Sequence, residues 1–519
     1  MLFPFPSERL RRLLGGRAAL FLVLMSWPVL LVSPSGTSMT DSMLLAAIRL
    51  ANEGTLTLSD GSDPERVFLT RAFDISFHDG RVYSGVGPGA SVVAAPLYLA
   101  AKPLFSFFGD EVVKNRRILG YYRPNSRGLG EAPATHFKDL YLLQIVLVLV
   151  LIAPLFALLL VRIDQRLVAR GSARSLSAAV VLAVGIGSMA LYYCSMYSGQ
   201  ALAYLLVWHA LLSLSDGALA ARGASLFAGA AFGTAIAVDY PSALAVALAL
   251  VFTLPRLLPA RRFEVLVPLA FSAGMLLLYH SLAFGSPLTT PYQNRFWLAT
   301  EAAAERGLVA FEEGRRPTAN LPSPEVMLQL SFGLYKGLFL YSPVLLLGLL
   351  GHFRALGEAS RSRAPHLLSL AVFFAYLVFN STLGTHVPRY GHHFWGGLSM
   401  LWGPRHLVAV LPFLAGGLAG LDWGKAWARW ASLLSLVLSC GINVTGAMFS
   451  DVIMSTYAFG PDLRYPIGYA FRLLAERGPR APLLDAYGVD PRAQAAIVVG
   501  LALATIVVVV VRVKQYKGG

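Results

Sequence analysis

Charged side chains are scarce in this sequence. Asp, Glu, Lys and Arg together make up 14% of its 519 residues, against about 25% in an ordinary soluble domain. Hydrophobic residues make up 56% of the chain, and the mean hydropathy is +0.60. A soluble globular fold is therefore excluded as the first interpretation, and the composition indicates a membrane protein.

Cysteine is nearly absent as well. The chain has two, Cys194 and Cys440, and each lies inside an apolar run. A disulfide framework of the kind that stabilises small secreted proteins is not indicated, and the two thiols are expected to behave as small core side chains.

Acidic residues are outnumbered by basic ones, 28 against 43, which gives a formal net charge of +15. Such an excess could indicate binding to nucleic acid. Here, however, the basic residues flank the apolar runs instead of forming one patch. We therefore expect no nucleic-acid partner, and the partner that the pattern predicts is a lipid bilayer.

Long apolar runs are what the sequence has in abundance. Several reach the roughly 20 residues that cross the core of a bilayer. About twelve can be placed, near 18–33, 140–161, 176–195, 198–215, 224–238, 240–256, 264–284, 331–351, 366–384, 404–421, 428–449 and 494–512. The sequence thus predicts an all-α polytopic membrane protein with about 12 transmembrane helices.

Basic residues indicate which side of the membrane each connection faces. Alternate connections are short and basic, as short cytoplasmic segments are, and they include Arg9, Arg166, Arg222, Arg261, Arg361, Lys425 and Lys514. Both ends of the chain are therefore predicted to be cytoplasmic. The predicted location is the inner (cytoplasmic) membrane of a cell, with any active site on the extracytoplasmic side.

The connections predicted on the outer side differ greatly in length, and the chain divides accordingly. The predicted parts are a basic N-terminus with the first helix (1–33), an outer loop carrying short interfacial helices (34–139), a transmembrane core (140–449) with outer loops 285–330 and 385–403, a further outer loop (450–493), and the last helix with a basic tail (494–519). Because no cytoplasmic domain is visible, chemistry is expected on the outer face.

Acidic candidates are few, and Asp41 is the first acid after the first span. A carboxylate at the membrane surface could accept a proton from an acceptor hydroxyl. The competing interpretation is a plain helix N-terminus, because Asp41 suits a first turn. Asp74, Asp79 and Asp239 are secondary acidic candidates, although Asp79-Gly80 is also a hairpin signal and Asp239 a turn former.

Cations and aromatics gather between the ninth and tenth spans, in "THVPRYGHHFWGGLSMLWGPRHL". Arg389 and Arg405 could each bind phosphate oxygens with two parallel hydrogen bonds. Tyr390, Trp395 and Trp402 offer flat faces to a sugar or a lipid. The competing interpretation is an aromatic belt with arginines that extend to the interface.

Two further cations and one more aromatic complete the candidates. Lys336 lies just inside the predicted eighth span, where a charge is costly without a polar partner. Arg81 and Tyr83 precede the glycine-rich turn "SGVGPG". The four histidines near Arg389 fit no metal-binding spacing and have no interleaved acid, so no metal site is predicted and a divalent cofactor is not firmly implied.

Five segments in order resemble those of one enzyme superfamily. They are "SGTSMTDSMLLAAIRLANEGTL", "RVYSGVGPGASVVAAPLY", "YHSLAFGSPLTTPYQN", "YKGLFLYSPVLLLGLLG" and "FWGGLSMLWGPRHLVAVLPFL". Their order over about 35–414 resembles the GT-C superfamily of polytopic membrane glycosyltransferases, in particular the protein O-mannosyltransferase-like branch.

The resemblance implies a polyprenyl-phosphate-linked sugar as donor and transfer to a hydroxyl acceptor, with inversion at the anomeric carbon. It implies that Asp41 matches the general base, and that Arg389, Arg405 and Lys336 are candidates for the donor phosphate. Two features differ from many relatives: Ser42 replaces a second acid, and only Arg81 stands near the glycine-rich turn. A changed donor, a changed acceptor or an inactive paralogue would each account for this.

Two other classes remain open from the sequence. A transporter or flippase would carry ionisable residues deep in its spans and show paired halves, whereas here the mid-span candidates are few and no repeat is visible. A non-catalytic binder of lipid-linked sugars would share every feature except activity. The donor sugar and the nature of the acceptor, whether lipid, glycan or protein, are not predicted.

Overall fold

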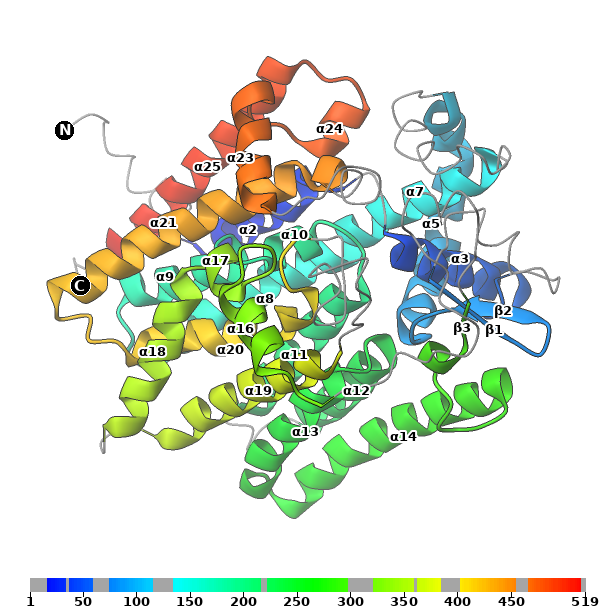
Figure 1. Ribbon diagram of the computed structural model, residues 1–519, viewed down its shortest axis with the longest axis horizontal. Helices are drawn as coiled ribbons and strands as arrows, with labels where there is room; N and C mark the ends of the chain where they lie inside the picture. The colour runs from blue at the N-terminus through cyan, green and yellow to red at the C-terminus, as the bar shows by residue number, and fades with distance from the viewer. Residues whose placement is uncertain are drawn as a thin grey trace.

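A computed structural model describes residues 16–33, 37–58, 74–114, 134–215, 222–296, 321–358, 362–383, 402–453 and 465–514. Helices make up most of this part of the chain (Figure 1). The predicted helical class is therefore confirmed. Of the candidate residues, Arg389, Tyr390 and Trp395 lie outside the described residues.

The helices of the first half are α2 (Arg17–Leu30), α3 (Ser38–Glu53), α5 (Gly89–Lys114), α7 (Ala134–Leu147), α8 (Ala153–Ala169), α9 (Arg174–Gly185), α10 (Ala190–Cys194), α11 (Gly199–Ser215), α12 (Arg222–Val238), α13 (Ser242–Thr253) and α14 (Pro259–Phe284). Those of the second half are α16 (Pro324–Phe332), α17 (Leu338–Tyr341), α18 (Val344–Gly357), α19 (Arg363–Thr382), α20 (Leu411–Gly416), α21 (Ala426–Met448), α23 (Pro466–Arg477), α24 (Pro482–Ala486) and α25 (Pro491–Lys514). Shorter turns are the π-helical η2 (Val148–Ile152) and the 3₁₀ turns η3 (Leu254–Arg256), η4 (Pro291–Asn294), η6 (Arg405–Val410) and η7 (Gly417–Gly420).

Every predicted span overlaps an apolar helix. In the described part of the chain, five helical segments are long and apolar enough to cross a membrane: Lys138–Ala169, Pro259–Phe284, Arg363–Thr382, Ala426–Met448 and Pro491–Lys514. The other apolar helices have 10 to 17 residues. The count of about twelve spans therefore stays a prediction.

The eighth predicted span, 331–351, is not one helix. It is divided into the end of α16, a turn, α17 and α18. Glycine and proline cause the breaks: the Gly337 N–H bonds back to Gly333 O at 2.6 Å to close a turn, and Pro343 stands before α18. Lys336 consequently lies in this turn and not within a helix.

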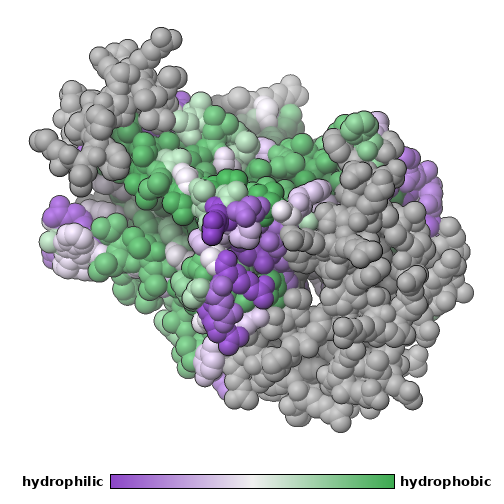
Figure 2. Space-filling model, turned by 90° about the horizontal axis from the view of Figure 1, so that it is seen from above, coloured by the Kyte–Doolittle hydropathy of each residue, from purple (hydrophilic) through white to green (hydrophobic). Residues whose placement is uncertain are grey.

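The surface of α14 supports a lipid environment. This helix runs along one edge of the molecule and packs chiefly against α12 (Figure 1). Its outward side chains are large and apolar, with Phe263, Phe271 and Leu282 exposed by 68%, 70% and 74%. Figure 2 shows that apolar residues cover much of the described surface in that view, with hydrophilic residues gathered at its centre and edges. Such a helix face is stable against hydrocarbon and not against water.

A small sheet accompanies the helices, in the order β2-β1-β3, with β1 (Ile75–His78), β2 (Arg81–Ser84) and β3 (Arg295–Phe296). Asp79 (φ 45°) and Gly80 (φ 70°) form the turn between β1 and β2, which is the conformation a two-residue hairpin needs. The hairpin interpretation of Asp79-Gly80 is confirmed. The all-α class is thus incomplete, because an antiparallel hairpin lies within the first loop.

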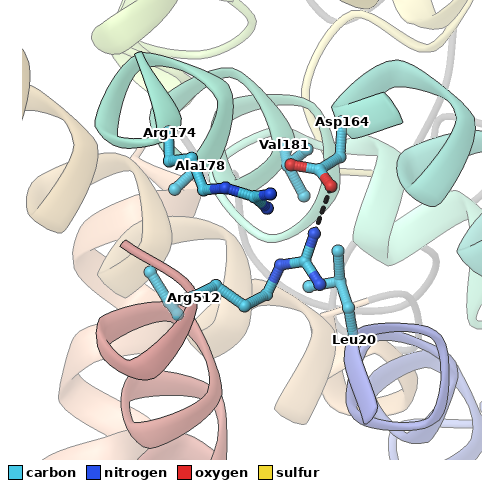
Figure 3. A pocket seen from close by; sticks show the side chains of 7 residues that line it. Leu20, Asp164, Arg174, Ala178, Val181 and Arg512 are labelled. Atoms are coloured by element: carbon cyan, nitrogen blue, oxygen red, sulfur yellow. Dashed lines mark hydrogen bonds and ion pairs between the residues drawn. The ribbon is translucent and has the colours of Figure 1, made fainter. Parts of the chain in front are cut away.

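Helix ends predicted on the same side of the membrane meet one another. On one side, the Ser33 N–H bonds to Ser195 O at 2.9 Å, and Gly89 packs against the backbone of Ala237 at the end of α12. On the other side, the start of α2, the end of α8, the start of α9 and the end of α25 surround one small pocket (Figure 3). The alternation of the helices is therefore consistent with the predicted topology, while its orientation relative to the cytoplasm remains a prediction from the basic residues.

Candidate functional site

Asp41 lies in the first turn of α3 and is 2% exposed. The helix begins there because Thr37 caps it: its hydroxyl accepts a hydrogen bond from the Thr40 N–H at 3.0 Å. The Thr40 hydroxyl in turn donates to Tyr197 O at 3.0 Å, which fixes the start of α3 against the segment between α10 and α11. Asp41 is therefore a buried acid at a positioned helix N-terminus.

Gln200 connects α3 to the turn between α12 and α13. It stands in the first turn of α11 and is 6% exposed. Its Nε2 donates to Asp239 Oδ1 at 3.4 Å and lies 3.9 Å from the sulfur of Met39, two residues before Asp41. Asp239 and the first turn of α3 are therefore on opposite sides of one glutamine.

Arg405 and Lys336 are close enough to repel each other. Lys336 is 7% exposed, and its Nζ donates to Gly403 O at 3.4 Å, two residues before Arg405. Burial, followed by the charge of Arg405, holds the pKa of Lys336 well below its usual range. Two positive side chains that the sequence separates by 69 positions thus meet at the same helix ends.

The same arginine acts on Asp239. This carboxyl lies in the turn between α12 and α13, and removal from water raises its pKa to about 6, although Arg405 and the hydrogen bond from Gln200 oppose the rise. An acid whose pKa lies near neutrality is typical of a functional site. Asp239, a secondary candidate from the sequence, therefore lies within reach of the charge of Arg405, which also acts on Lys336.

Asp239→Asn is expected to raise the unfolding temperature at pH 7.5 by a few degrees. The pKa of Asp239 is higher in the fold than its ordinary value of 3.8, so the ionised form is unfavourable in the fold, and this cost is complete only above pH 6. At pH 5 most of the wild-type carboxyl is protonated in the fold, so the gain should shrink. Thermal unfolding in detergent at both pH values measures this.

The matched control is Asp79→Asn, because Asp79 is 90% exposed in the hairpin turn. It should not change the unfolding temperature at either pH. A lower unfolding temperature for Asp239→Asn at pH 7.5 would contradict the assignment of an unfavourable buried charge.

Trp402 is fully buried and already has protein neighbours on its ring. Its Nε1 donates to Asn443 Oδ1 at 3.2 Å, Tyr341 packs edge-on at 4.9 Å, and Gly446 leaves room for the indole on α21. Next to it Gly403 has φ 65°, a conformation that glycine adopts without strain. In this structure Trp402 is a core side chain that holds the start of η6 in place.

The candidates of the first loop lie in and beside the hairpin. Tyr83 is 5% exposed and packs against Phe284 at 5.2 Å. Arg81 and Asp79 are exposed near the turn, and Asp74 precedes β1, where its carbonyl accepts from the Gly85 N–H at 2.7 Å. These four candidates therefore lie together in and next to the hairpin.

No metal site is assembled in the part of the chain that the structure describes: no three His, Cys, Asp or Glu side chains come together there as a metal would require. His386, His392 and His393 lie outside the described residues. His406 is described, and its Nε2 lies 3.2 Å from Arg405 Nε.

A small pocket lies at the opposite helix ends. Figure 3 shows Arg512 paired with Asp164, with Arg174 pointing toward the same carboxylate. The Ser177 hydroxyl donates to the other oxygen of Asp164 at 2.7 Å. A carboxylate satisfied by an arginine and a hydroxyl is a structural tie, and it joins α8 and α9 to α25.

Sequence reasoning missed Gln200. A single glutamine at the start of an apolar run carries no motif, and its importance follows only from the position of Asp239, 39 residues later. The one available signal was its polar character inside a run that is otherwise suited to cross a bilayer.

Comparison with known proteins gives two structural likenesses. The crystal structures of ArnT from Cupriavidus metallidurans, in the apo state and bound to undecaprenyl phosphate, align over 96% of this chain and 76% of theirs. The TM-scores are 0.44 and 0.41, at 16% and 15% identity. At these values neither likeness establishes the fold or the activity of this chain. No protein family and no curated protein match its sequence.

Proposed function

We propose that the protein is a membrane glycosyltransferase that moves a sugar from a polyprenyl-phosphate donor to a hydroxyl acceptor at the extracytoplasmic face. Asp41 acts as the general base. Arg405 and Lys336 bind the donor phosphate, and Arg389 is a further candidate. The ordered motifs described above support this assignment, as does the arrangement of charges at the helix ends.

The observation that carries the proposal is the pair of adjacent cations. Lys336 is 7% exposed, and Arg405 is near enough to lower its pKa. Two neighbouring positive charges repel each other, and an anion that binds beside both of them is attracted to the pair. The phosphodiester of a polyprenyl-phosphate sugar supplies such an anion, as does the phosphate monoester that leaves when the sugar is transferred, and its binding would relieve the repulsion.

The position of the cations suits an amphiphilic donor. Lys336 and Arg405 lie where α17 and η6 begin, at the ends of apolar segments. A polyprenyl tail remains in hydrocarbon, so its phosphate is delivered at the membrane interface and not at the bilayer centre. A soluble nucleotide sugar would have no need of a site at this depth.

The proposed reaction is one displacement. The Asp41 carboxylate takes the proton of the acceptor hydroxyl, whose oxygen forms a bond to the anomeric carbon. The bond from that carbon to the phosphate oxygen breaks, and its electron pair leaves with the polyprenyl phosphate. Lys336 and Arg405 stabilise the negative charge that develops on the departing phosphate. Attack opposite to the leaving group inverts the anomeric centre.

Arg405→Gln tests the phosphate site directly. We expect this change to weaken binding of polyprenyl phosphate about 10- to 100-fold, because a hydrogen bond to a charged group contributes about 1.5–3 kcal/mol. Binding is measured with the purified protein in detergent, and sugar transfer to a panel of hydroxyl acceptors is measured in parallel. Arg472→Gln, at a side chain 66% exposed on α23, is the matched control and should bind as the wild type does.

The outcomes of the binding and transfer measurements distinguish an enzyme from a flippase or a non-catalytic binder. Equal binding by the wild type and Arg405→Gln would contradict the phosphate site. Binding without transfer from any donor would favour the alternative, a flippase or a non-catalytic binder of lipid-linked sugars. Transfer by the wild type that Arg405→Gln weakens would support the enzyme.

A further inference from the structure

Two buried amide oxygens, one of them in a side chain that contacts Asp239, have no hydrogen-bond partner in the described structure. They are Gln200 Oε1 on α11 and Asn380 Oδ1 on α19, in side chains 6% and 1% exposed. An acceptor that is buried without a partner costs about 1–3 kcal/mol, and such atoms are rare in native proteins unless water or a ligand satisfies them. These two oxygens therefore need an explanation.

The amide nitrogens fix which way each oxygen points. Gln200 Nε2 is directed at Asp239 Oδ1 at 3.4 Å. Asn380 Nδ2 donates to Tyr376 O at 2.7 Å, within α19. In each side chain the amide nitrogen is therefore hydrogen-bonded within the protein, and the amide oxygen is the atom without a partner.

Gln200 contacts Asp239 directly, and Asn380 is linked to Asp239 through α19. The charge of Asp239 acts on Tyr376, whose carbonyl holds Asn380. The helix that follows Asp239, α13, packs against α19. Arg405 adds its charge from the start of η6, which also packs against α19.

The chemistry of this set selects its ligand. Two amide oxygens and a carboxylate accept hydrogen bonds and offer no donor toward a ligand. They would repel a phosphate and attract hydroxyl or amino groups. A sugar attached to a phosphate matches both the acceptors and the cation. Its hydroxyls would bind to the acceptor oxygens, and its phosphate would bind to Arg405.

We propose that Gln200, Asp239 and Asn380 form a subsite that binds the hydroxyl or amino groups of the sugar carried by the lipid donor. This inference rests on the proposed function and adds to it the residues that read the sugar. Buried acceptors discriminate strongly, because a sugar that lacks the matching hydroxyl leaves them without partners. The subsite therefore determines which donor is used.

The experiment compares lipids with and without a sugar. Binding of farnesyl phosphate and of its glucosyl, mannosyl and arabinosyl derivatives is measured for the wild type, Gln200→Leu and Asn380→Leu in detergent. In the wild type we expect at least one sugar to improve binding about 10-fold over farnesyl phosphate alone. Each variant should lose most of this gain and still bind farnesyl phosphate as before, which also shows that it is folded.

Gln144→Leu is the matched control. Gln144 is a glutamine 2% exposed on α7 whose Nε2 donates to Ser33 O at 2.8 Å, and its loss should not change the gain from the sugar. A wild type that binds all four lipids equally, or variants that keep the full gain, would overturn the subsite and leave the phosphate site standing. A wild type that binds none of the four would overturn the proposed function itself, and this inference with it.

Discussion

Asp41→Asn is expected to slow sugar transfer about 10²- to 10⁴-fold, the usual contribution of a general base. Asparagine has nearly the same size and can still occupy the first turn of α3, so the start of the helix should persist. The asparagine amide, however, cannot take up the proton of the acceptor hydroxyl. Because we propose that Lys336 and Arg405 bind the phosphate, affinity for the donor should stay within about 2-fold of the wild type, a change of at most ~0.4 kcal/mol.

The measurement is the rate of transfer under donor saturation, together with donor affinity, for both proteins. Asp422→Asn is a suitable control, since that acid pairs with Arg354 at 3.5 Å near the end of α18, away from α3. Transfer at the wild-type rate by Asp41→Asn would move the base to another acid, with Asp239, Asp74 and Asp79 as the candidates to change next.

Gly417→Ala is expected to have the largest effect on stability. Gly417 begins η7 and lies against Gly348 on α18, where a Cβ would overlap the backbone oxygen of Gly348. Gly351 and Gly420 make the same kind of contact at the same crossing. A methyl group there forces two backbones apart, and overpacking of this kind costs about 1–3 kcal/mol or more. The unfolding temperature in detergent should fall, as should the yield of folded protein.

The adjacent residue provides the control. A Cβ at Gly416 would meet nothing within 4 Å, so Gly416→Ala should be neutral or slightly stabilising through its better helix propensity. Equal behaviour of the two variants would contradict the close approach of α18 and η7. The comparison is sharp because both changes add the same methyl group one residue apart.

Local patterns predicted much of the fold. Apolar runs located the helices, since a run of hydrophobic residues that must satisfy its own backbone in lipid becomes helical. Asp79-Gly80 predicted the hairpin, because the two residues tolerate the positive φ that its turn requires. The breaks at Gly333–Gly337 and after Gly185 were missed, since hydropathy averages over the glycines that interrupt a helix.

The site residues remain predictions, and the structure adds how some of them lie. Arg405 was a phosphate candidate from its residue type and Lys336 from the family resemblance, and the structure places the two near each other. Trp402 was a candidate for contact with a sugar or lipid, and the structure places it in the core, because Asn443 and Gly446 on α21 provide its partner and its space. Gln200 gave no local signal. Contacts between residues far apart in the chain decided these cases, and one sequence does not display such contacts.

The ion pair between Asp164 and Arg512 has a consequence for the biogenesis of the protein. The two residues are 348 positions apart, so Asp164 enters the membrane long before its arginine is synthesised. A nascent chain cut short before α25 retains the carboxylate of Asp164 in α8 with Ser177 and Arg174 beside it but without its ion-pair partner Arg512, and removal of one partner of a buried pair is destabilising. Arrival of α25 therefore completes the charge balance of the bundle, so quality-control proteases are expected to degrade truncated chains faster than chains that contain Arg512.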